Sequence, residues 1–82
     1  MTYQEFKNDY LNLCLKFGRD TKRKILNDLK KDVEELTYRI ESIKEGVITS
    51  GYAYLYGEIY TKYDLSMLEQ ELQFTNQLIL EL

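Results

Sequence analysis

The chain has 82 residues, the size of one small domain, and a formal net charge of -3 because fourteen acidic residues outnumber eleven basic ones. It contains no histidine and one cysteine, which excludes the commonest general base, a thiolate zinc site and an internal disulfide. With 44% hydrophobic and 30% charged residues, the composition is typical of a folded globular protein and not of a disordered or membrane-embedded one.

The first predicted helix covers residues 2–17. Thr2 and Glu5 have the spacing of a capping box at its start. Gly18 follows its last apolar residue and suits a left-handed C-terminal cap. We interpret Cys14 as a small packing residue among apolar neighbours. The apolar face repeats in steps of three and four, as one side of a helix requires: Tyr3, Phe6, Tyr10, Leu13 and Phe17.

The second predicted helix covers residues 21–45. Asp20 or Thr21 is its expected N-cap, and Gly46 is its expected stop. Apolar residues follow one another in steps of three and four over nearly three heptads, which is the pattern of a coiled-coil seam. The seam consists of Leu26, Leu29, Val33, Leu36, Ile40 and Ile43.

The third predicted helix covers residues 50–81, with Asp64 as a possible cap of its C-terminal part. One heptad-like seam is accompanied by a second apolar stripe made of Met67, Phe74 and Leu78. A single neighbouring helix cannot cover both stripes, so we expect contact with two helices, or with one helix and a second chain. The main seam consists of Leu65, Leu68, Leu72, Thr75, Ile79 and Leu82.

Residues 47–63 fit two patterns. Tyr52, Tyr54 and Tyr56 alternate with smaller apolar residues, as in a β-strand, and Gly57 is a natural hairpin turn. The same residues also fit a helical stripe that continues to Met67. We favour the helix, because an isolated two-stranded hairpin is only marginally stable in water.

The predicted fold class is therefore all-α. One domain, residues 1–82, is built on a long antiparallel helical hairpin, residues 21–45 against 50–81, with residues 2–17 packed across it. The alternative is three helices with a small β-hairpin at residues 47–63.

A cluster of tyrosines is the main candidate binding site, since five of the eight lie within twelve residues. Tyrosine is enriched at protein interfaces, where its rigid ring gives a large contact area. A domain of this size cannot bury all five with their hydroxyl groups hydrogen-bonded. The alternative is that two or three are half-buried and the others cover helix ends. The predicted protein-binding residues are Tyr52, Tyr54, Tyr56, Tyr60 and Tyr63.

Residues 19–31 form a basic segment with six cations and two carboxylates. Such a segment can contact nucleic-acid phosphates. Against this function, the whole chain is acidic, and cations beside a helix N-terminus oppose the helix dipole. The alternative roles are solubility and pairing with the acidic residues Glu69 and Glu71 of the third predicted helix. The candidate nucleic-acid-binding residues are Arg19, Lys22, Arg23 and Lys24.

No catalytic motif is present: there is no GxGxxG, phosphate-binding loop, GxSxG or HExxH sequence. We therefore expect no enzymatic activity, no cofactor and no metal. The predicted function is a small protein-binding regulator or inhibitor that acts through the tyrosines. The alternatives are a self-assembling structural or scaffold protein and a nucleic-acid-binding protein. A homodimer or larger homo-oligomer is expected, because so small a domain lacks disulfides and metals to stabilise it.

The N-terminal residues do not have the basic and then apolar pattern of a signal peptide, and no apolar stretch approaches the roughly 18–20 residues of a membrane span. Together with the lone cysteine, this predicts a cytoplasmic protein that has no membrane partner. The preference for Lys over Arg, with many Tyr, Ile and Asn residues, is typical of AT-rich coding sequence and favours a bacterial or phage origin.

Overall fold

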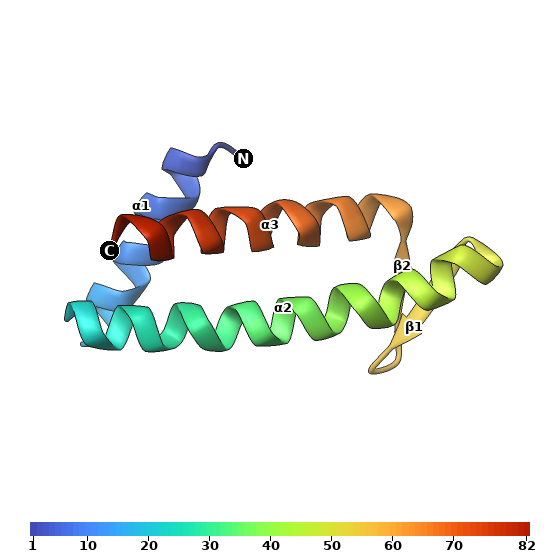
Figure 1. Ribbon diagram of the computed structural model, residues 1–82, viewed down its shortest axis with the longest axis horizontal. Coiled ribbons are helices and arrows are strands. Elements are labelled where there is room, and N and C mark those ends of the chain that lie inside the picture. Colours follow the sequence, from blue (N-terminus) through green and yellow to red (C-terminus); the bar gives the residue numbers. More distant parts are fainter.

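The computed structural model describes residues 1–82 and is mostly helical, with three helices and one two-stranded sheet (Figure 1). Helices α2 and α3 run antiparallel and side by side, and α1 crosses them at the end where α2 begins and α3 ends. The two strands form an antiparallel hairpin at the opposite end. The elements in chain order are α1 (Tyr3–Lys16), α2 (Lys22–Ser50), β1 (Tyr52–Leu55), β2 (Glu58–Thr61) and α3 (Lys62–Glu81).

The ends of α1 follow from the residues that cap it. The Thr2 hydroxyl accepts the N–H of Glu5 at 3.2 Å and donates to the Glu5 carboxylate at 3.1 Å. The first of these is one of the two hydrogen bonds of the expected capping box. In place of the second, the Glu5 carboxylate accepts from the Thr2 hydroxyl and not from the Thr2 backbone N–H. At the C-terminus, Gly18 has a φ of +67°, and the N–H of Arg19 donates to the Cys14 carbonyl at 2.7 Å. The helix therefore ends in a Schellman motif.

The prediction that α2 ends at Gly46 is wrong. The helix continues to Ser50, and Gly51, with a φ of +83°, is its left-handed cap. Gly46 lies inside the helix because β1 passes over it: a Cβ atom at Gly46 would lie 2.6 Å from the Cβ of Ala53. The glycine therefore permits a close contact between a helix and a strand and does not stop the helix.

The favoured prediction of a continuous helix over residues 50–81 is also wrong. A β-hairpin occupies residues 52–61, so the fold is not purely all-α, and the alternative of three helices with a small hairpin is confirmed within narrower bounds than 47–63. The marginal stability of an isolated hairpin does not apply here, because this hairpin is not isolated. It packs against α2, and Ala53 is buried in that contact.

Helix α3 begins at Lys62, with Thr61 as its N-cap. The Thr61 hydroxyl accepts the N–H of Asp64, and the Asp64 carboxylate accepts the N–H of Thr61 at 2.9 Å. Asp64 is thus the second member of a capping box and not the cap itself. These hydrogen bonds hold the pKa of Asp64 below its ordinary value.

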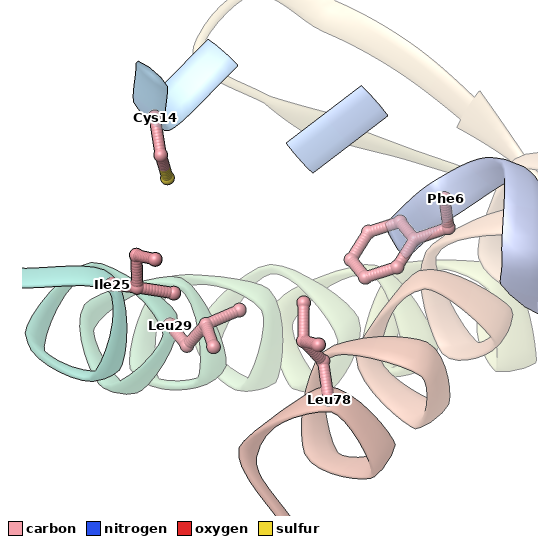
Figure 2. Packing of buried hydrophobic residues seen from close by; sticks show 5 residues of the cluster. All are labelled: Phe6, Cys14, Ile25, Leu29 and Leu78. Carbon is pink, nitrogen blue, oxygen red and sulfur yellow. The ribbon is translucent and has the colours of Figure 1, made fainter. Parts of the chain in front are cut away.

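Eight of the ten buried hydrophobic residues form two clusters at opposite ends of α2, and Leu36 and Ile40 are buried on the stretch of α2 between them. The cluster at the α1 end joins all three helices, and Figure 2 shows Cys14 and Phe6 of α1 pointing towards the α2 and α3 side chains beneath them. The cluster at the hairpin end consists of Ile43, Val47 and Ala53, with half-buried neighbours from both strands and α3. The residues of the α1-end cluster are Phe6, Cys14, Ile25, Leu29 and Leu78.

The predicted helix faces hold in part. Cys14 is buried, as expected, but Leu13 and Phe17 of the predicted α1 face are exposed, because α1 crosses the other two helices and does not run along them. In α2, Ile25 is buried in place of Leu26, since α1 covers that side of the helix start. None of the three helices has the length and apolarity needed to cross a membrane.

Candidate functional site

The outward side of the hairpin carries large exposed side chains. Tyr54 pairs with Ile59 and Tyr52 pairs with Thr61 across the two strands. Because paired residues project to the same side of a sheet, these four side chains share one surface, here called the hairpin face. Tyr52 is 57% exposed, Tyr54 73% and Ile59 59%. The protein therefore presents two rings and a branched aliphatic side chain to solvent on a regular strand pair.

The other side of the hairpin anchors it to the helices. Ala53 is buried against Gly46, and Leu55 and Tyr60 pack against the hairpin-end core cluster. Ala53 pairs with Tyr60, so both side chains are on the inner side of the hairpin. The small side chain of Ala53 allows β1 to lie close to α2, whereas the larger side chain of Tyr60 extends further from the strand. These inward contacts hold the backbone of the hairpin in a fixed position on α2.

Tyr60 is therefore separated from the other predicted tyrosines. It is half-buried on the inner side, where its hydroxyl donates to the Glu58 carboxylate at 2.6 Å and accepts a hydrogen bond from Arg39 at 3.4 Å. The hydrogen bond to Glu58 is the main reason that the pKa of Tyr60 is raised. Tyr60 joins strand to helix, in contrast to Tyr52 and Tyr54, which have no such role.

Tyr56 and Gly57 form the two-residue turn between the strands. Both have a positive φ, 51° and 80°, as the type I′ hairpin turn requires. The ring of Tyr56 is 74% exposed and lies 5.8 Å from the guanidinium carbon of Arg39 on α2. Tyr63, 73% exposed, lies in the first turn of α3. These two rings flank the hairpin and do not belong to its outward strand surface.

The four basic candidates differ in their contacts within the molecule. Arg19 binds both carboxylate oxygens of Asp28, at 2.7 and 2.8 Å, which lowers the pKa of that carboxyl group. Lys24 reaches the Gly18 carbonyl at 3.4 Å. Lys22 and Arg23 line a shallow hollow on α2. Two of the four cations are thus used to close the turn between α1 and α2.

A hollow that the sequence did not predict lies along α3 and is here called the apolar groove. It has a volume of about 430 Å³. Met1 and Phe6 from the N-terminal segment and Tyr60 from the hairpin line it together with α3, so three separate segments form it. The lining residues are Met1, Phe6, Tyr60, Asp64, Met67, Leu68, Gln70, Glu71 and Phe74.

An acidic cleft adjoins this groove and shares Leu68 and Glu71 with it. The cleft is lined by three carboxylates, and its one cation, Arg39, forms an ion pair with Glu35 at 3.4 Å. Glu71 is exposed at the surface, but partial loss of hydration is the main cause that raises its pKa. Repulsion from Asp32 adds to this increase, and Arg39 offsets it only in part. The carboxylates of the acidic cleft are Asp32, Glu35 and Glu71. They do not converge as a metal site would.

Comparisons of the chain with protein-family models, curated proteins and solved structures found no match. Two surface residues had sequence signals that could have been used. Ile59 lies opposite Tyr54 once a two-residue turn at Tyr56–Gly57 is assumed. Met67 belongs to the second α3 stripe and is the member of that stripe which stays 55% exposed.

Proposed function

We propose that this protein is a non-enzymatic regulator or inhibitor that binds another protein through the hairpin face. The observation that carries the proposal is the exposure of Tyr52, Tyr54 and Ile59 on one side of a hairpin whose other side is fixed to α2. Rigid aromatic residues bind at low entropic cost, because few side-chain torsions have to be ordered. An exposed apolar strand surface is otherwise an aggregation liability, which favours a binding role.

The experiment compares proteins captured by three forms of the purified chain. Tyr54→Thr with Ile59→Thr removes the apolar contacts of the hairpin face while keeping residues of high strand propensity. Tyr38→Ala is the matched control, because Tyr38 is a 56% exposed tyrosine on α2, outside the hairpin. A protein retained by the wild type and by Tyr38→Ala, but not by the double variant, supports the proposal.

Circular dichroism must show the same helix content for all three forms. Capture of the same proteins in the same amounts by the double variant would refute a binding role for the hairpin face. If the basic segment, residues 19–31, binds nucleic acid instead, the affinity should fall steeply as the salt concentration rises, because contacts with phosphates weaken with salt.

Self-assembly through the hairpin face is the second candidate. In a two-fold dimer, the exposed Tyr52, Tyr54 and Ile59 of one copy can pack against the same three side chains of a second copy. Light scattering during size-exclusion chromatography tests this: a dimer that the Tyr54→Thr, Ile59→Thr variant converts to a monomer supports it, and a wild-type monomer at high micromolar concentration rejects it.

A further inference from the structure

The second apolar stripe of α3 is only partly covered within the molecule. Leu78 is fully buried, and Phe74 packs against Tyr3 and Phe6 of α1, with ring centroids 5.7 Å apart in each case. Met67 lies beyond the reach of α1 and is 55% exposed. The uncovered part of this stripe forms the floor of the apolar groove.

The spacing of the lining residues along α3 suits a bound helix. Its α3 lining runs from Asp64 to Phe74 in steps of three and four, which is about 15 Å along the helix axis. Apolar side chains of a helix repeat at the same interval, so a helix lying along α3 can place one side chain per turn in the groove. The occupant would continue the helical layer to which α1 already belongs.

The charges around the groove indicate which polar side chains the bound helix should carry. Glu71 borders both the apolar groove and the acidic cleft, and none of the three ion pairs in the structure involves it. Repulsion from Asp32 and Glu35 adds to its loss of hydration and raises its pKa. A cation placed beside Glu71 would relieve this repulsion, so lysine or arginine side chains next to the apolar ones suit the site.

A two-fold dimer with groove against groove does not fit these requirements. Two grooves facing each other would bring Asp64 and Glu71 of both copies together, which is unfavourable. In such a dimer the chain's own basic hollow would not face Glu71, because it is on a different side of α2: with 3.6 residues per turn, Lys30 and Asp32 project in directions about 160° apart. Lys30 lines the basic hollow and Asp32 the acidic cleft.

We propose that the apolar groove and the acidic cleft together bind a basic amphipathic helix of another protein. The site is distinct from the hairpin face, and the inference does not depend on the function proposed for that face. Apolar side chains of the bound helix cover Met67 and Phe74, and its lysine or arginine side chains lie beside Glu71.

The test uses three synthetic peptides of about 18 residues, a length at which an isolated helix can form. The first arranges leucine and lysine as an amphipathic helix, the second has the same composition in scrambled order, and the third replaces lysine by glutamate. Titration of fluorescently labelled peptides into the full chain should show binding of the first peptide only. Equal binding of the scrambled peptide, or no binding of the first at about 1 mM, overturns the proposal.

Variants then place the bound peptide. Met67→Lys, at an exposed position, should weaken binding by about tenfold or more, and Glu71→Gln by about two- to fivefold. Glu41→Gln removes the same charge from an exposed position of α2 outside both hollows and should have no effect. An equal effect of Glu41→Gln and Glu71→Gln would show only general charge attraction and would refute the site.

The hairpin variant Tyr54→Thr, Ile59→Thr separates the two proposals. It should bind the amphipathic peptide as the wild type does, because its substitutions lie outside the groove. Loss of peptide binding in this variant would place the peptide on the hairpin face and overturn the groove proposal.

Discussion

Gly46 and Ala53 approach so closely that position 46 has no room for a side chain. A Cβ atom on Gly46 would lie 2.6 Å from the Cβ of Ala53 and 2.9 Å from its Cα. Gly46 is the only glycine within α2, and β1 crosses the helix at this point. The position and tilt of the hairpin are therefore set by the absence of one side chain on α2.

Gly46→Ala should destabilise the protein although alanine is the better helix former. Alanine gains about 1 kcal/mol in an exposed helix, but here its methyl group meets the backbone of β1, which cannot move aside as a flexible side chain would. We expect a net loss of about 1–3 kcal/mol in the free energy of unfolding, measured by urea denaturation. Asn27→Ala, at an exposed position of α2, is the control and should be neutral or slightly stabilising. A Gly46→Ala variant as stable as the wild type would contradict the close contact.

Tyr56→Asn should stabilise the hairpin. Tyr56 has a φ of 51°, which is costly for an aromatic residue and well tolerated by asparagine in a type I′ turn. Loss of the contact with Arg39 offsets part of the gain, so we expect up to about 1 kcal/mol in thermal or urea unfolding. Tyr56→Ala is the comparison, because it removes the ring without supplying a residue suited to this φ. If the asparagine variant is no more stable than the alanine variant, the turn assignment is wrong.

Glu71→Gln should stabilise the fold at neutral pH while weakening the peptide binding proposed above. The pKa of Glu71 is raised, so folding disfavours its ionised form, and the neutral amide should add a few tenths of a kcal/mol at pH 7. As the pH falls through the raised pKa, the wild-type carboxyl becomes protonated and the advantage shrinks. Below the ordinary value of 4.5, none should remain. Urea denaturation of both proteins between pH 4 and pH 7 measures this difference, and a constant difference would contradict it.

Cys14 should react slowly with thiol reagents in the folded protein. The side chain is buried in the α1-end cluster, and the loss of hydration raises the pKa of its thiol, which lowers the thiolate fraction. We expect the modification rate at pH 8 to be lower than in urea-unfolded protein by at least about tenfold. Equal rates would mean that α1 is detached from the other helices for most of the time.

The sequence predicted the helices where the apolar period and the caps agreed. Thr2, Thr21 and Gly18 act at the ends for which their chemistry is suited. The predicted end of α2 at Gly46 is wrong, because a glycine that ends a helix and a glycine that allows a close contact give the same sequence signal. Only the position of the crossing strand distinguishes them. A hairpin of two strands is only marginally stable alone, and here contact with α2 stabilises it, which is a tertiary effect that no local pattern indicates.

The candidate site was predictable only in part. The density of tyrosines marked the hairpin region, but their division between an outward pair, an inward Tyr60 and a turn residue depends on the strand register. The apolar groove depends on how far α1 extends along α3. The angle at which α1 crosses α3 determines this, and no local sequence pattern encodes that angle. Exposure of Met67 follows from the packing of helices that are distant in sequence.

The two core clusters differ in how far apart their residues lie along the chain. The hairpin-end cluster and its neighbours fall between Ile43 and Leu68, whereas the α1-end cluster joins Phe6 to Leu78. Long loops cost more entropy to close, and short-range contacts form faster. We therefore expect the hairpin end to form early in folding and α1 to dock last. Because Met1 and Phe6 line the apolar groove, the groove becomes complete only at that final step, and transient undocking of α1 would open it without unfolding the hairpin face.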